Sequence, residues 1–226
     1  MNCRTLTIRF ANELRHDEVP QLRGAVIASL NEKLTLFHNH TGGDTLRYSY
    51  PLIQYKVLDG RAAMVCLNEG ADAVGEFFAS GNFGVRLGER EATLAVDRIE
   101  PRQWQIQVWD QTFRYRVRRW LPLNGDNYRQ WQATESVAVR SALLERVLQG
   151  NILSMAKGLG IRLDGRVSAT ITRIAEPRWA RVKGVHVLML DAEFNANVTL
   201  PAPAGIGKHA SLGFGIIDDT QRTEPY

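Results

Sequence analysis

Apolar and polar residues alternate at the start of the chain and then change to a helical period. Leu6, Ile8 and Phe10 alternate with polar neighbours, which predicts a strand over residues 3–10. From residue 17 to about residue 35, apolar side chains recur every four positions. This spacing predicts a helix that packs one face on a sheet through Leu22, Val26, Leu30 and Leu34.

The same half of the chain continues with a hairpin, a short helix and another strand. Strands near residues 47–57 and 61–68 flank Asp59-Gly60, a dipeptide typical of two-residue hairpin turns. A helix over residues 71–80 and a strand over residues 92–99 follow. The order strand, helix, strand, strand, helix, strand is the split βαβ order of the ferredoxin-like fold.

The second half begins with two predicted strands and a long helix. Residues 104–109 and 112–120 have strand patterns, and Asn124–Asn127 has the composition of a loop. Ser136 is placed to cap a helix that runs to about Lys157, where Gly158 marks its end.

The remaining pattern partly repeats the order of the first half. Residues 166–174 and 185–199 predict strands, and a glycine-rich loop leads to a last short strand. We therefore expect an α+β fold of two tandem ferredoxin-like domains. The first spans residues 1–100 and carries a histidine loop; the second spans residues 101–226 and carries a basic strand and the glycine-rich loop.

Composition then narrows the class of protein. The chain has 226 residues, of which 44% are hydrophobic and 23% charged, which is ordinary for a globular protein and excludes disorder as the main state. No apolar run is long enough to cross a membrane, and no leader precedes the first strand, so we expect a cytoplasmic protein. Cys3 and Cys66 are too few for a disulfide framework and are expected as buried free thiols.

The positive charge is concentrated in the second half. The net charge is −2 over residues 1–110 and +6 over residues 111–226, and arginines outnumber lysines by 23 to 5. Arginine presents a planar fork that binds phosphate in two places, so this bias favours a polyanionic partner. A GC-rich genome would produce the same bias, and composition alone does not separate the two explanations.

Arginines also alternate along one predicted strand. Arg114, Arg116 and Arg118 share one face of the strand. A solvated sheet face has the same pattern, but no acidic residue lies within the run, which favours contact with RNA. Farther on, Arg178 and Arg181 flank Trp179 in a predicted turn, where the tryptophan is either a core residue or a platform for a base.

The glycine-rich loop carries the most specific motif of the sequence. Two Gly-apolar-Gly pairs, Gly205–Gly207 and Gly213–Gly215, enclose Lys208, His209 and Ser211. Exposed backbone N–H groups beside a lysine suit phosphate oxygens. The spacing fits neither a Walker A loop nor a dinucleotide-binding fingerprint. A glycine-rich hairpin packed on a helix is the structural alternative.

This pattern resembles the signature of CRISPR-associated repeat-RNA processing endoribonucleases of the repeat-associated mysterious protein (RAMP) superfamily. The run Phe194–Pro201 before the loop adds to the match. The resemblance implies two tandem ferredoxin-like domains and cleavage of CRISPR repeat RNA without metal or cofactor. The resemblance and the arginine pattern together predict these RNA contacts: Arg114, Arg116, Arg118, Arg178, Arg181, Gly205, Gly207, His209, Ser211, Gly213 and Gly215.

The resemblance also points to a histidine loop after the first helix. His38 and His40 match the family's catalytic histidine by position, and His40 ranks first because it lies nearer the glycines at 42–43. An imidazole that titrates near neutrality can take or give the protons of RNA cleavage. No further His or Cys clusters nearby, so zinc is not expected, whereas ordinary loop histidines remain the alternative.

One part of the family pattern is missing. The family often adds a tyrosine to the first helix, but residues 11–36 contain none, which leaves Tyr48 or Tyr50 as substitutes. Lys208 or a nearby arginine would stabilise the charge of the transition state. Besides an endoribonuclease, the sequence allows a non-catalytic RNA-binding subunit of a CRISPR effector complex, or a ferredoxin-like module for a small molecule. Effector subunits and a second copy of the chain are candidate partners.

Overall fold

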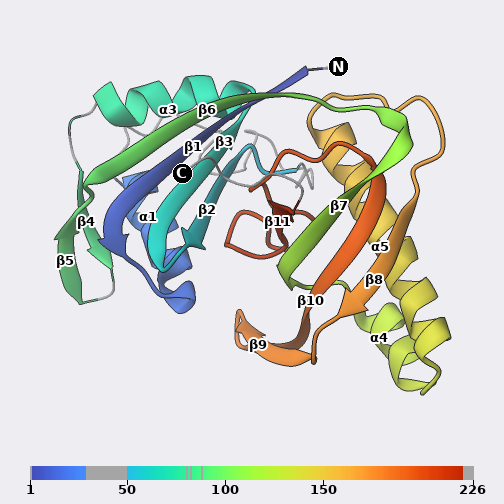
Figure 1. The fold of residues 1–226 in the computed structure, drawn as a ribbon. Helices are drawn as coiled ribbons and strands as arrows, with labels where there is room; N and C mark the ends of the chain where they lie inside the picture. Colours follow the sequence, from blue (N-terminus) through green and yellow to red (C-terminus); the bar gives the residue numbers. More distant parts are fainter. Residues whose placement is uncertain (1, 29–49, 80, 82, 88, 221–226) are drawn as a thin grey trace, which may run out of the picture. The chain divides into compact units, whose positions relative to one another are not determined.

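The computed structural model describes residues 2–28, 50–79, 81, 83–87 and 89–220, which form two compact units (Figure 1). The N-terminal unit comprises residues 2–104 and also residues 211–213. The C-terminal unit comprises the described residues of 105–210 and 214–226. The chain therefore returns to the N-terminal unit for three residues near its end.

A four-stranded sheet forms the N-terminal unit, in the order β2-β3-β1-β6. β3 pairs antiparallel with both β1 and β2, so it separates the two strands that the first helix connects. This is the split βαβ arrangement expected from the sequence. The strands are β1 (Asn2–Glu13), β2 (Ile53–Leu58), β3 (Arg61–Leu67) and β6 (Val96–Gln105).

Two helices pack into the core of this unit. A 3-10 turn, η1 (His16–Glu18), precedes α1 (Val19–Ala28), and α3 (Glu69–Ala79) follows β3. Leu22 and Val26 of α1 share one apolar cluster with Phe77 of α3. The predicted hairpin turn is confirmed, because Asp59 and Gly60 have φ angles of 52° and 77°. Leu30 and Leu34 lie outside the described residues.

The end of the N-terminal unit differs from the prediction. The single strand expected over residues 92–99 is two strands, β5 (Arg90–Thr93) and β6, and β5 forms a hairpin with β4 (Gly84–Leu87). The side chain of Asn12 produces the step between them, since it accepts from Ala95 N and donates to Thr93 O. β6 continues through residues 100–101, where the sequence suggested a domain boundary.

The C-terminal unit contains a sheet in the order β11-β7-β10-β8, with β9 paired to the first part of β10. As in the first unit, the third main strand, here β10, lies between the first two and pairs antiparallel with both. The strands are β7 (Val108–Trp120), β8 (Ala169–Ile174), β9 (Arg178–Val182), β10 (Val185–Val198) and β11 (Ile216–Asp219). The two strands predicted near residues 104–120 are thus the end of β6 and one continuous β7.

A long helix, α5 (Val137–Gly158), covers this sheet (Figure 1). The Ser136 side chain accepts from Val139 N, which confirms the predicted cap. Leu144, Leu148 and Ile152 are fully buried, whereas Val139, expected on the apolar face, is 54% exposed. Val139 lies in the first turn of the helix, away from the buried positions.

Two segments predicted as irregular are regular elements. The expected loop at residues 124–127 begins α4 (Gly125–Gln132), because the Asn124 side chain accepts from Asn127 N at 2.7 Å and caps the helix. The expected turn around Trp179 is the strand β9. Turn-forming residues such as Asn and Asp are also the residues that begin helices, so composition alone did not separate the two outcomes.

The glycine-rich loop takes the place of a second helix. A split βαβ order would place a helix between the last two strands, but residues 199–215 between β10 and β11 contain none. None of the described helices is long and apolar enough to cross a membrane. Cys3 and Cys66 are buried free thiols, as expected.

Candidate functional site

The predicted histidine loop cannot be placed. His38, His40 and Tyr48 lie in residues 29–49, outside the described part of the chain. Tyr50, the other tyrosine proposed for the site, is described and is buried. Burial raises the pKa of its hydroxyl, so Tyr50 stays protonated at neutral pH. The geometry of the site therefore comes from the C-terminal unit.

The two Gly-apolar-Gly pairs of the glycine-rich loop lie against each other. Ile206 N donates to Gly215 O at 2.9 Å, and Gly215 N donates to the carbonyl oxygen of Arg119 on β7 at 3.0 Å. Ile206 is fully buried and Phe214 is 8% exposed. The apolar residue of each pair thus anchors the loop in the core, while its glycines let the backbones approach.

Glycine is sterically required at two of these positions. A Cβ on Gly215 would lie 1.9 Å from Ile206 O, and its φ angle is +64°. A Cβ on Gly207 would lie 2.6 Å from Asn151 Oδ1, an atom that accepts from the buried Trp120 indole at 2.9 Å. The motif therefore has a structural cause, which is the closure of the loop on β7 and α5.

The residues between the glycine pairs carry positive charge. Lys208 Nζ donates to Leu123 O at 3.4 Å, and an ammonium has three donors, so it retains capacity for other oxygens. Burial lowers the pKa of His209, and the neighbouring charges of Lys183 and Lys208 lower it further. Ser211 lies in the N-terminal unit, where its carbonyl oxygen accepts from Tyr55 N at 3.0 Å.

The alternation of the basic strand is confirmed. Arg114 and Arg116 are exposed, while Tyr115 and Val117 between them are buried. The acidic partners that were absent from the run come from neighbouring strands. Arg118 donates to both carboxylate oxygens of Asp218 at 2.6 and 2.9 Å, and Arg116 Nη2 lies 3.4 Å from Asp191 Oδ2. Among the described residues, no ion pair involves Arg114.

Asp191 on β10 and Arg119 on β7 are site residues that the sequence interpretation missed. Asp191 Oδ1 accepts from Arg119 N and from Arg178 Nη2, both at 2.8 Å. Arg119 has a φ angle of 53°, and its guanidinium lies 4.9 Å from the centre of the Phe214 ring. The pairing of β7 with β10 shifts register here, because Leu190 pairs with Trp120 whereas Ala192 pairs with Val117, which leaves a bulge at Arg118 and Arg119. The consecutive arginines interrupt the alternation, and they were the one signal of this bulge in the sequence.

The second basic segment, around Trp179, was expected as a turn and is instead the strand β9. Arg178 is held by Asp191, and Arg181 lies opposite His186 on β10. Trp179 is 58% exposed, so the alternative that it belongs to the core is wrong.

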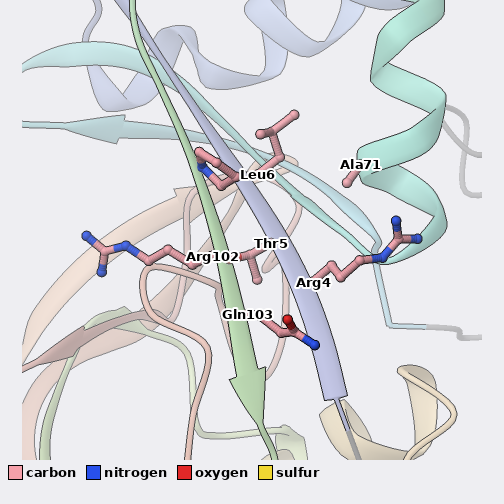
Figure 2. A pocket seen from close by; sticks show the side chains of 7 residues that line it. Arg4, Thr5, Leu6, Ala71, Arg102 and Gln103 are labelled. Carbon is pink, nitrogen blue, oxygen red and sulfur yellow. The ribbon is translucent and has the colours of Figure 1, made fainter.

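A pocket of about 450 Å³ lies elsewhere, in the N-terminal unit, and Figure 2 shows its lining. Its two arginines point away from each other and have carboxylate partners, since Arg4 binds Asp72 at 2.8 and 3.2 Å and Arg102 lies 3.5 Å from Glu100. No predicted site residue lines it. The lining residues are Arg4, Thr5, Leu6, Ala71, Pro101, Arg102 and Gln103. Within the described ranges, no group of three or more acidic, His or Cys side chains is placed to hold a metal ion.

Comparison with known proteins matches nearly the whole chain to one family. The model of the Cas6b N-terminal domain matches residues 1–105, and the model of the Cas6b C-terminal domain matches residues 107–220. An uncharacterized protein of Methanocaldococcus jannaschii, MJ0978, is 33% identical over 98 residues. That match covers 43% of this chain and 65% of the relative, which is less than two thirds of the relative's length.

Solved structures show the same fold. A Cas6b crystal structure has a TM-score of 0.87 over 97% of this chain and 100% of that one, at 23% identity. A structure described as the CRISPR RNA processing endoribonuclease Cas6b has a TM-score of 0.73 over 96% of this chain and 98% of that one, also at 23% identity. A type IV Cas6 crRNA endonuclease, Csf5, reaches 0.60 at 16% identity over 96% and 98% of the two chains. These likenesses confirm the tandem ferredoxin-like fold.

Proposed function

This chain belongs to the Cas6b family, and on that premise we propose that it is an endoribonuclease that cuts CRISPR repeat RNA into guide RNAs. One solved relative is described as a CRISPR RNA processing endoribonuclease of the same family. The whole-chain match to both Cas6b domain models is the observation that carries the proposal.

The proposed reaction is an attack within the RNA strand. The 2′-OH of one nucleotide attacks the adjacent phosphorus, the bond to the 5′-oxygen of the next nucleotide breaks, and the products carry a 2′,3′-cyclic phosphate and a 5′-OH. One proton leaves the 2′-OH and one reaches the departing 5′-oxygen, and His40 or His38 transfers one of them. This chemistry needs no metal-bound water, because the attacking oxygen is the substrate's own 2′-OH.

The cations of the glycine-rich loop support an electrostatic role beside this reaction. The phosphate gains negative charge in the transition state, and a fixed cation stabilises that charge more than the ground state. Lys208 is suited to this because its loop is closed on the core by backbone hydrogen bonds and its ammonium has donors to spare. Most of the conformational entropy that ordering this loop costs is therefore lost when the protein folds, before the RNA binds.

The arginines of the predicted RNA-contact set differ in whether a carboxylate already holds them. Arg118 and Arg178 are held by carboxylates, so they present their remaining donors in fixed positions. Arg114 has no such constraint among the described residues and is placed for phosphate contact along β7. The RNA-contact set predicted from the sequence thus contains both fixed and adaptable cations.

Cleavage of cognate repeat RNA in EDTA tests the proposal. We expect the wild-type protein to cut the RNA, a 2′-deoxy nucleotide at the cleavage position to block it, and His38→Ala, His40→Ala together to abolish cleavage while binding persists. The products are identified by mass, which distinguishes a cyclic phosphate from a free 3′-OH.

Two results would overturn parts of this proposal. Cleavage that survives the double substitution but stops in EDTA would exclude the proposed chemistry. Salt-dependent binding of intact RNA without turnover would instead indicate the alternative, a non-catalytic RAMP-type subunit of an effector complex. Light scattering with and without RNA measures whether a second copy of the chain takes part.

A further inference from the structure

An exposed aromatic pair lies on the C-terminal unit, apart from the glycine-rich loop. Trp179 of β9 is 58% exposed, and its ring centre lies 6.3 Å from that of Tyr128 on α4, at an interplanar angle of 74°. The two rings come from segments about fifty residues apart in the sequence, so the fold brings them together. The edge-to-face contact holds the tryptophan in one orientation and leaves a large part of its surface to solvent.

A second aromatic residue on α4 extends this surface. Trp131 follows Tyr128 by three positions, which places both on one side of the helix. The guanidinium of Arg140 lies 4.8 Å from the centre of the Trp131 ring, and Arg140 Nε donates to Trp131 O at 3.3 Å. The surface already stacks one planar cation on an aromatic ring.

The charge beside Trp179 is positive. Arg181 lies two residues farther along β9 and so shares the face of Trp179, and His186 is opposite it on β10. No ion pair of Arg181 occurs among the residues that the structure describes. Figure 1 shows β9 and the paired part of β10 as a hairpin at the end of the C-terminal sheet.

We propose that Trp179 and Tyr128 form a stacking site for an unpaired nucleobase of the RNA substrate, with Arg181 on the adjoining phosphate. This deepens the proposed function and rests on it. Every base has a π-face that an exposed aromatic ring can cover, and a neighbouring arginine neutralises the backbone. The base must be unpaired, because both faces of a base inside a duplex are already stacked.

Positive charge favours RNA over a protein partner at this surface. A protein-docking tryptophan sits in an apolar centre from which charged residues are depleted. Here the same hairpin face carries Arg181, and the half of the chain that contains it has a net charge of +6. An anionic, flat ligand meets both properties of the surface.

Affinity for repeat RNA with an unpaired flank tests the site. We expect Trp179→Ala to weaken binding by about 5- to 150-fold, the range for loss of one stacked base. Trp179→Phe keeps an aromatic face and should stay within about threefold of wild type. Trp179→Leu keeps apolar bulk without that face and should behave like the alanine variant. Fluorescence anisotropy with labelled RNA measures all three.

Matched controls separate stacking from folding and from charge. Val185→Ala changes a residue of the same hairpin that is 61% exposed and should leave affinity and thermal midpoint unchanged. Arg181→Gln should lower the slope of log K against log salt by about 1, whereas Trp179→Ala should leave that slope unchanged. An abasic flank should weaken the wild type to the level of the alanine variant.

Three outcomes would overturn the stacking site. Full RNA affinity in Trp179→Ala would show that Trp179 does not bind the RNA. Full affinity in Trp179→Leu would show that the contact does not depend on stacking. A change in self-association with unchanged RNA affinity would show that the surface binds a second copy of the protein. Failure of the proposed function is distinguishable, because it would appear as a wild-type protein that binds no repeat RNA, or that binds the RNA through this site and leaves it uncut.

Discussion

Gly215 shows what one residue of the site has to be. Its φ angle is +64°, and a Cβ there would meet the backbone of Ile206 at 1.9 Å, an atom that cannot move without opening the loop. Gly184, in the turn between β9 and β10, has a φ angle of +83° but nothing within 4 Å of the same position. The two glycines share a conformational requirement and differ in steric surroundings.

We therefore predict that Gly215→Ala is far more destabilising than Gly184→Ala. The Gly184 variant bears the cost of a left-handed alanine alone, about 1–2 kcal/mol. The Gly215 variant adds the displacement of the Ile206 carbonyl, which breaks the loop closure. Thermal unfolding of both variants measures the difference, and equal midpoints would show that the loop backbone yields freely.

His209 makes the stability of the C-terminal unit depend on pH. Burial and two lysines lower the pKa of its imidazole from 6.5. On acidification the unfolded chain therefore binds a proton at this residue before the folded protein does, so the free energy of unfolding falls as pH drops below about 6.5. Asn tolerates the positive φ angle of this position without titrating.

The corresponding prediction is a flatter pH profile in His209→Asn. Denaturant unfolding between about pH 5.5 and pH 7.5 should show a steeper loss of stability on acidification in the wild type than in the variant. Above pH 7 the two profiles should run parallel. A wild type that becomes more stable on acidification relative to the variant would mean that the histidine gains an anionic partner.

At the scale of elements, β7 carries two arginines with carboxylate partners, Arg116 and Arg118, and one, Arg114, that we propose contacts RNA. Arg118 binds both oxygens of Asp218, whereas Arg114, four positions earlier on the same face, has no ion pair among the described residues. We predict that Arg114→Gln weakens binding of all RNAs about equally and lowers the salt slope by about 1. Arg118→Gln should mainly cost stability, about 1 kcal/mol or less.

Titration of RNA binding at several salt concentrations, together with thermal midpoints, tests this division. An equal fall in slope for both variants would show that Asp218 releases Arg118 when RNA binds. The comparison is matched, because both changes remove one charge from the same face of one strand.

Elements with local signals were predictable from the sequence, and those decided by strand pairing were not. Asp59-Gly60 and the Ser136 cap specify their turn and helix within a few residues. The glycine motif likewise identified the loop. Asp191 and Asp218 pair with arginines 75 and 100 positions away, and no local pattern carries that information. Trp179 was wrongly placed in a turn, because the polar residues of a short strand at the edge of a sheet have the composition of a loop.

At the scale of the whole molecule, charge and fold follow the same division. The basic half of the sequence supplies the glycine-rich loop, the arginines of β7 and the aromatic surface, and all of these except Ser211–Gly213 lie in the C-terminal unit. The near-neutral half supplies the histidines proposed for proton transfer. The charge favoured a polyanion without excluding a compositional bias of the genome, and the proposal that the polyanion is RNA rests on the glycine motif and the family.

Ser211–Gly213 belong to the N-terminal unit, and this has a consequence for synthesis. Tyr55 N on β2 donates to Ser211 O, and Leu212 packs against the core of that unit, so its last contacts span most of the chain. Contacts between such distant residues form slowly, and nascent chains emerge from their N-terminus. We therefore expect the N-terminal unit to complete its contacts only after Ser211 has been synthesised, late in translation.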